Sequence, residues 1–360
     1  MINRKLAPKF TLDYQFDYVK ANSSKLKNKQ KLFYVTSLSQ QMIKLELVFD
    51  AGYVNHKNSI IPTTVGQLLF DGTTNKNSNQ IAEIIEGEGA FYDASCGAET
   101  FSITVYVLKN NLEKVLEVVT DVIKNASFPK IEIDKFVKIQ KQKFLVNKEK
   151  VSFLARNEFS EAIYPKGSSY HSALQEADFK LIKRGELIRF YEQFIKAKSF
   201  RVYSAGALDK ESMEVIENYI GGLEIKERPS EPISIVKCID DFNIQLINKE
   251  ESLQSGIRIG KLLIPKTHKD FPKLFLLNTI LGGYFGSRLM TNIREDKGYT
   301  YGIGSGLSSN KKESTFFIST EVGSDYTKAT VTEIEKEIEK LQKQLVSEKE
   351  LDLVKNYLFG

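Results

Sequence analysis

The 360-residue chain contains the same order of predicted elements twice, and this repetition is what most restricts its fold. In each half the pattern runs strand, helix, glycine-containing turn, helix, strand and helix. Alternating apolar and polar side chains over residues 42–49 and 101–107 predict two half-buried strands in the first half. The second half repeats the order, with strands over 239–264, 299–309 and 314–322. We therefore expect an α+β fold with two similar domains, each an antiparallel β-sheet with helices packed mainly on one face.

The stretch KERPSEP at residues 226–232 is the predicted linker between the halves. It combines charged residues, a serine and two prolines, and it has no apolar periodicity. We place the first domain at residues 1–228 and the second at residues 229–360, with a boundary close to residue 230.

Helical spacing of apolar residues predicts a helix over 111–124, and a long helical region follows at 132–163. Near the chain end, Ser347 and Glu350 have the spacing of a capping box and predict one more helix. The sequence stops at Gly360, barely three turns later. Either this helix is terminal or the second domain lacks its final elements.

Composition is typical of a soluble globular protein and gives no sign of a nucleic-acid or membrane partner. The net charge is +5, and the basic residues form no reader motif for nucleic acid. We interpret the charge-rich stretches 135–150 and 331–344 as solvated helix faces. No apolar run is long enough to cross a membrane, and the first residues contain no signal-peptide core. We expect no nucleic-acid or membrane partner.

Cysteine and histidine usage argues against a metal centre built from these residues. Two cysteines that lie far apart, Cys96 and Cys238, predict free thiols in a reducing compartment, and we expect a cytoplasmic protein. The three histidines, His56, His171 and His268, are not close to one another in sequence. We interpret each as a surface residue rather than a ligand.

Two segments carry a resemblance to a known family. Residues 68–108, LLFDGTTNKNSNQIAEIIEGEGAFYDASCGAETFSITVYVL, contain an LFDGT element, a helix end at IAEIIEGEG and a strand. Residues 255–260 read SGIRIG, and residues 281–305 read LGGYFGSRLMTNIREDKGYTYGIGS. The first segment resembles the zinc-site region of the insulinase/pitrilysin peptidase family, and the others resemble its C-terminal domain. The chain looks most like the half-length, heterodimer-forming branch of that family.

The resemblance implies a zinc site whose residues have been lost. Family members place zinc ligands on a helix that reads H-x-x-E-H, with a glutamate base between the two histidines and a further glutamate downstream. Alignment on LFDGT puts Thr63, Gly66 and Gln67 at the His, Glu and His positions. The distant glutamate would fall within 135–148, a stretch without any carboxylate. We therefore expect no catalytic residue and no zinc in this chain.

The resemblance also implies a substrate-binding pair in the second half. Arg294 and Tyr301 match an Arg/Tyr pair that, in the family, contacts the bound peptide near the scissile bond. A guanidinium and a phenol are donors that can hold a carbonyl oxygen as negative charge develops on it. The alternative is that Arg294 caps a helix and Tyr301 packs at the start of a strand. The matching residues around the pair, Asn292, Gly298 and Gly302, favour the first interpretation.

Two functional hypotheses follow from the resemblance. In the first, the chain is a non-catalytic subunit of a heterodimeric zinc endopeptidase that grips an unfolded peptide as an added strand on a sheet edge. The partner would be a half-length zinc-bearing homologue that supplies metal and general base, and zinc would be present only there. In the second, the chain is a structural or peptide-binding scaffold without any role in proteolysis. Either hypothesis leaves open a homodimer in isolation.

Overall fold

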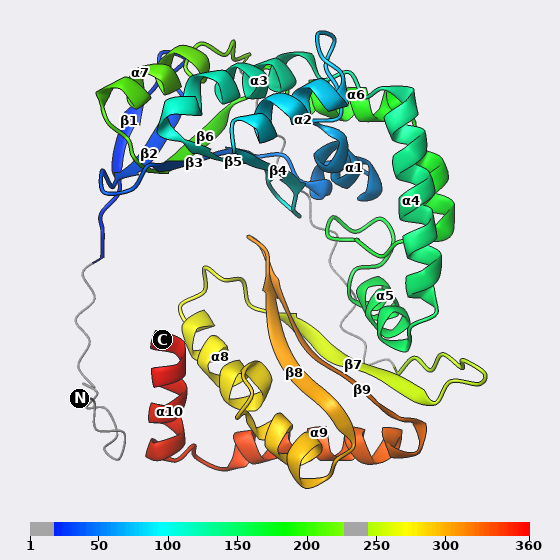
Figure 1. The fold of residues 1–360 in the computed structure, drawn as a ribbon. Coiled ribbons are helices and arrows are strands. Elements are labelled where there is room, and N and C mark those ends of the chain that lie inside the picture. The colour runs from blue at the N-terminus through cyan, green and yellow to red at the C-terminus, as the bar shows by residue number, and fades with distance from the viewer. Residues whose placement is uncertain (1–17, 227–243) are drawn as a thin grey trace, which may run out of the picture.

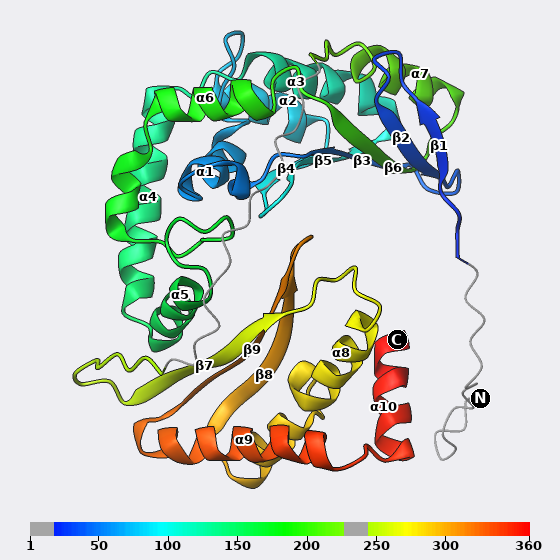
Figure 2. The same cartoon turned by 180° about the vertical axis from the view of Figure 1, so that it is seen from behind.

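The computed structural model describes residues 18–226 and 244–360 and contains two lobes that are joined along one side (Figures 1 and 2). One lobe is built on a six-stranded sheet and the other on a three-stranded sheet. Both sheets combine with helices, so the fold is α+β as predicted. Within the described residues no helix is both long and apolar enough to cross a membrane.

The first sheet has the strand order β1-β2-β6-β3-β5-β4. Its strands are β1 (Asn22–Lys25), β2 (Lys31–Thr36), β3 (Met42–Phe49), β4 (Phe91–Cys96), β5 (Phe101–Leu108) and β6 (Phe200–Gly206). The predictions for β3 and β5 are confirmed, but the sheet is mixed and not purely antiparallel, because β2 pairs with β6 in parallel. The reason is that β6 inserts between β2 and β3. These two strands run in opposite directions, so β6 must be parallel to one of them.

The helices of the first half lie mainly over the outer face of this sheet and along one of its ends (Figure 1). They are α1 (Ile60–Leu68), α2 (Ser78–Gly87), α3 (Leu112–Asn125), α4 (Lys130–Lys148), α5 (Val151–Ile163), α6 (Arg184–Phe194) and α7 (Lys210–Tyr219). Short 3₁₀ turns are η1 (Tyr53–Asn55), η2 (Lys109–Asn111) and η3 (Glu176–Leu181). The helical region predicted over 132–163 is two helices, α4 and α5, which descend from the first lobe to the second (Figure 1).

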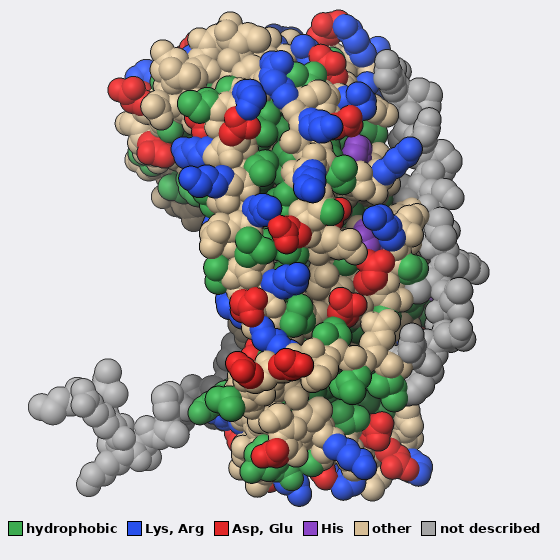
Figure 3. All heavy atoms as spheres, turned by 90° about the vertical axis from the view of Figure 1, so that its right-hand side faces the viewer, with side chains coloured by type: hydrophobic (Ala, Val, Ile, Leu, Met, Phe, Trp, Pro, Cys, Tyr) green, Lys and Arg blue, Asp and Glu red, His purple; other side chains and the backbone are tan. Residues whose placement is uncertain are grey.

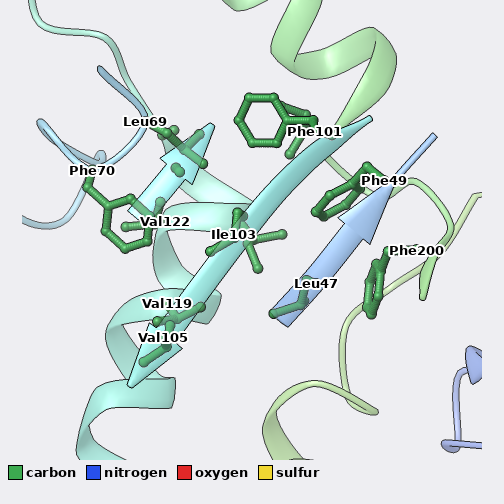
Figure 4. Packing of buried hydrophobic residues seen from close by; sticks show 14 of the residues in the cluster. Leu47, Phe49, Leu69, Phe70, Phe101, Ile103, Val105, Val119, Val122 and Phe200 are labelled. Carbon is green, nitrogen blue, oxygen red and sulfur yellow. The ribbon is translucent and has the colours of Figure 1, made fainter. Parts of the chain in front are cut away.

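The core of the first lobe lies between the sheet and α3. Figure 4 shows Ile103 and Val105 of β5 beside Val119 and Val122 of α3, and all four are fully or almost fully buried. The inward positions of the strand alternate with outward ones, whereas those of the helix recur every three or four residues. This match of two periodicities is why the sequence pattern located both elements correctly.

The second sheet is antiparallel, with the order β7-β9-β8. Its strands are β7 (Gln254–Leu263), β8 (Thr300–Ser309) and β9 (Ser314–Gly323). The other elements are α8 (Phe271–Asn278), the π-helical turns η4 (Thr279–Gly283) and η5 (Met290–Asp296), the 3₁₀ turn η6 (Ser324–Tyr326), α9 (Thr327–Lys343) and α10 (Glu348–Phe359). The predicted strands at 299–309 and 314–322 are confirmed. Of the region predicted over 239–264, only β7 is a strand among the described residues.

The predicted capping box is half formed. The Ser347 side chain accepts a hydrogen bond from the Glu350 amide at 3.2 Å, as an N-cap residue should. The Glu350 carboxylate, however, accepts a bidentate pair from Arg288, with both N–O distances 2.8 Å. That pairing holds the pKa of Glu350 below its usual range. It also fastens α10 to the chain between η4 and η5.

The predicted linker lies almost entirely outside the described residues, so the domain boundary near residue 230 stays a prediction. Cys238 lies outside them too. Cys96 is a free thiol, and burial raises its pKa to about 12, so it is not a reactive thiolate at neutral pH. Figure 3 shows acidic and basic side chains interspersed over the face turned toward the viewer.

A carboxylate joins the two lobes at the β8–β9 turn. Glu99, from the turn between β4 and β5, accepts hydrogen bonds from the Lys311 amide at 2.8 and 3.0 Å. It accepts a third from the buried Tyr170 hydroxyl at 2.6 Å. Close by, the Tyr164 hydroxyl is 3.0 Å from Thr315 Oγ1. We call the contact of Glu99 with Lys311 and Tyr170 the Glu99 joint.

Replacing Glu99 by alanine should loosen this joint. A hydrogen bond to a charged acceptor contributes about 1.5–3 kcal/mol. We therefore expect amide hydrogen exchange over residues 309–313 to become at least about tenfold faster in Glu99→Ala. The matched control is Asp50→Ala, which removes exposed ion pairs with the Lys311 and Arg201 side chains and leaves Glu99 in place, so it should change exchange there very little. Unchanged exchange in Glu99→Ala would show that the lobes are held by other contacts.

Candidate functional site

Helix α1 holds the three positions at which the family resemblance expects zinc chemistry. The Thr63 hydroxyl donates to the carbonyls of Ser59 at 2.8 Å and Ile60 at 3.1 Å, so it is engaged by its own helix. Gln67 is exposed, one helical turn further on. The helix geometry therefore puts positions 63 and 67 on one face, but the side chains there are a hydroxyl and an amide, both poor zinc ligands.

Gly66 lies between these two positions and faces the edge strand β4. An added Cβ would be 3.2 Å from the Cys96 amide nitrogen and 3.3 Å from the Ala94 carbonyl oxygen. The glycine lets α1 approach the backbone of β4 closely. No side chain is available here to act as a general base, and a larger residue would require α1 or β4 to shift.

The rest of a zinc site is also missing. Residues 135–148 fall within α4, where the family resemblance expects a glutamate ligand, and they contain no carboxylate. Across the described residues no group of three or more His, Cys, Asp or Glu side chains has an arrangement suited to a metal ion. The residues present therefore do not fit the zinc centre that the resemblance implies.

The purified chain should accordingly retain no stoichiometric zinc after dialysis, because the donors at positions 63, 66 and 67 cannot compete with water for the metal. Metal analysis by mass spectrometry measures this directly. As a control, Thr63→His combined with Gln67→His should retain more zinc, because two imidazoles one turn apart form a partial site. A stoichiometric, tightly held zinc ion in the unmodified chain would contradict the assignment.

The histidines are less uniform than predicted. His268 is 41% exposed, as expected for a surface residue. His171 is only 16% exposed, and its Nδ1 lies 2.8 Å from the Tyr164 carbonyl oxygen, so the surface interpretation was wrong for it. His56 is half-buried, with Nδ1 2.9 Å from the Asn58 carbonyl oxygen. Each ring is satisfied by local backbone groups.

The second lobe brings Arg294 and Tyr301 together. Arg294 lies in η5 and its Nε donates to the Tyr301 carbonyl at 3.0 Å, while the Tyr301 side chain is 94% exposed. Gly298 makes this possible, because its φ of +66° turns the chain back at the end of η5. The alternative interpretation expected Tyr301 to pack at the strand start, and its ring does not.

Phe285 supports the Arg294 side chain and escaped the sequence analysis. Its ring centroid lies 4.7 Å from Arg294 Cζ, a cation–π distance, and the ring is 64% exposed. Residues 281–305 carried the family resemblance, and Phe285 was not singled out among them. A large aromatic residue within a glycine-rich turn was the signal that could have drawn attention to it.

Asn292, which also matches the family pattern, has a structural task. Its Nδ2 donates to Glu337 at 2.7 Å and to Glu333 at 3.1 Å, which fastens η5 to α9. Glu337 is only 4% exposed and is also paired with Lys340. The prediction that helix 331–344 has a wholly solvated charged face is therefore wrong at Glu337.

Asn292→Ala should lower the free energy of unfolding by about 1–3 kcal/mol, because the buried Glu337 carboxylate loses a donor. Chemical denaturation measures the change. Glu339→Ala is the matched control on the same helix. Its side chain is 56% exposed, so we expect an effect within about 0.5 kcal/mol. Equal effects of the two substitutions would show that Asn292 does not brace η5.

Two family profiles match the sequence, one in each half of the chain. Residues 34–172 match "Insulinase (Peptidase family M16)", and residues 182–358 match "Peptidase M16 inactive domain". Together they span most of the chain, which belongs to the M16 insulinase family of peptidases.

Similar proteins agree with this membership. A protein from Rickettsia bellii named as an uncharacterized zinc protease is 24% identical over 91% of this chain and 79% of its own length. Cytochrome b-c1 complex subunit 1 of Bos taurus is 22% identical over 68% of this chain and 52% of its own. The crystal structure of a peptidase M16 inactive domain from Pseudomonas fluorescens superimposes with a TM-score of 0.82 at 21% identity, covering 95% of this chain and 84% of that one.

Proposed function

We propose that this chain is the non-catalytic subunit of a heterodimeric zinc endopeptidase. The observation that carries the proposal is the contrast between the two lobes. Thr63, Gly66 and Gln67 occupy the positions of α1 at which the family resemblance expects zinc chemistry, whereas Arg294 and an exposed Tyr301 are held together in the second lobe. A scaffold with no link to proteolysis has no evident need for the second feature.

The chemistry of the pair suits a bound peptide. Arg294 Nε is committed to the Tyr301 carbonyl, and Nη1 lies 3.7 Å from Glu295 Oε1, an ion pair longer than a hydrogen bond, so the terminal nitrogens can still donate to a substrate oxygen. The exposed Tyr301 hydroxyl is a second donor. Two such donors aimed at one carbonyl would stabilise the charge that develops during peptide hydrolysis at a partner's zinc ion.

Strand β4 offers a place for the peptide backbone. It is the last strand of the first sheet and pairs only with β5 among the described residues. The exposed Phe91 at its start would lie beside an incoming strand. Backbone pairing of this kind binds unfolded peptides with little dependence on their side chains.

The proposed partner is a half-length homologue that carries the intact H-x-x-E-H helix and supplies both zinc and the general base. The name of the Rickettsia bellii relative supports a link to zinc proteolysis. We place both subunits in the cytoplasm. Affinity capture of the tagged chain from its own cells, followed by mass spectrometry, tests whether such a homologue binds it.

A scaffold without proteolytic function is the second candidate. The bovine relative favours it, because that protein is named as a subunit of a respiratory complex and not as a protease. A scaffold would be expected to bind other proteins, or itself as a homodimer, without adding peptidase activity to any of them. Reconstitution with a zinc-bearing homologue therefore separates the two candidates.

Tyr301→Phe should lower the peptidase activity of the reconstituted pair by up to roughly 100-fold, since one donor to a developing oxyanion typically contributes about 3 kcal/mol. Only a hydroxyl is removed, and the ring is already exposed, so stability and partner binding should not change. Arg294→Ala should lower activity as well, but it also releases the Tyr301 carbonyl.

Asp296→Ala is the matched control, since it removes a neighbouring exposed charge and leaves both donors and the Arg294–Glu295 ion pair in place. Full activity in stable Tyr301→Phe and Arg294→Ala variants would move the scaffold candidate ahead. Loss of folding in both variants would assign the pair a structural role instead.

A further inference from the structure

A guanidinium group is held between aromatic rings where the first half of the chain meets the second sheet. Helix α5 packs against β7, and an added Cβ on Gly256 would collide with the Val151 carbonyl. Next along this face of β7 is Arg258, whose Cζ lies 4.0 Å from the Phe317 ring centroid on β9 and 5.3 Å from that of Phe159 on α5. Arg258 is therefore fixed in place by residues of both halves.

This guanidinium has no acidic partner. Among the described residues Arg258 forms no ion pair, and its Nε is buried without a hydrogen-bond acceptor. The side chain remains half-exposed, so part of it reaches solvent. A buried donor without an acceptor carries an unrelieved desolvation cost, which a bound acceptor would remove.

A second guanidinium lies close enough to act on the first. Arg156 of α5 is exposed, is stacked on Phe153 with Cζ 5.4 Å from the ring centroid, and likewise forms no ion pair with a described residue. Its positive charge adds to burial in lowering the pKa of Arg258. Arginine side chains are effectively always charged in proteins, so two like charges lie on this contact with no ion-pair partner among the described residues.

Acidic side chains on the same elements do not pair with these arginines. Glu321 lies opposite Gly256 on the same face of the sheet, and Glu158 lies on α5. Neither forms an ion pair with Arg156 or Arg258 in the described part of the chain. Among residues 18–226 and 244–360 no acidic side chain supplies the compensating charge, which leaves a place for an anionic ligand.

We propose that Arg156 and Arg258 form a subsite for a carboxylate of an extended peptide, which rests on the proposed peptide-binding function. A carboxylate has the planar pair of oxygens that an arginine fork binds with two hydrogen bonds. The flanking rings of Phe153, Phe159 and Phe317 would contact the carbon atoms of the acidic side chain. The subsite would make the chain prefer peptides with a glutamate or aspartate over their amide counterparts.

Binding of two fluorescent peptides to the full-length chain tests this. Both are unstructured and identical, except that one carries glutamates where the other carries glutamines. We expect the chain to bind the glutamate peptide about tenfold more tightly. Arg156→Gln and Arg258→Gln should each lower that preference without changing affinity for the glutamine peptide. Arg189→Gln, on the distant α6, should leave the preference intact.

Arg258 is partly buried, so Arg258→Gln could unfold the chain. Arg156 is exposed, and the test stands on Arg156→Gln alone if thermal melting shows that the other variant is unfolded. Equal affinity for the two peptides, no binding of the glutamate peptide, or a preference that survives Arg156→Gln would each overturn the subsite. Peptidase activity of a reconstituted pair does not enter this measurement, so the failure of either proposal can be told from the failure of the other.

Discussion

The arrangement of the two lobes depends on one carboxylate. Glu99 accepts hydrogen bonds from the Lys311 amide and the buried Tyr170 hydroxyl, so a single side chain binds the tip of the β8–β9 hairpin to the turn after β4. The burial of Tyr170 and its hydrogen bond to Glu99 raise the tyrosine pKa, which keeps this phenol a donor at any physiological pH. Helix α5 also packs on β7. Together these two contacts fix where α1 and β4 lie relative to the second sheet.

The two lobes differ in the side chains that they place at the candidate site. Helix α1 has no metal-binding side chain at the positions where the family resemblance expects them, and Gly66 allows the helix to approach the β4 backbone. The second lobe instead holds the Arg294 side chain in place and exposes the Tyr301 ring. Phe285 stacks on Arg294, the turn at Gly298 returns the chain, and the Tyr301 ring is left in solvent. The exposed ring adds little to the packing of the lobe, and it leaves the Tyr301 hydroxyl accessible to a ligand. This difference underlies the peptide-binding role that we propose.

Elements with a clear apolar period were predictable, and contacts between distant elements were not. The pattern over Met42–Phe49 located β3, and the alternation from Phe101 located β5. The parallel pairing of β2 with β6 was missed because no local pattern states which strand inserts between two others. The Glu350 carboxylate was expected at its own N-cap, where a donor lies three residues away. In the folded chain it binds Arg288 instead, which offers two charged donors.

The sequence by itself determined the family resemblance, the α+β class and the residue types at positions 63, 66 and 67, because each depends only on which residues are present and at what spacing. Thr63, Gly66 and Gln67 lack the needed donors in any fold. Tertiary structure alone decided that Glu337 is buried, that Glu99 joins the lobes and that Arg258 lies between two rings without an anion. In each of these cases the energy of a charged group depends on the solvent and partners around it, and residues far away in the chain supply both.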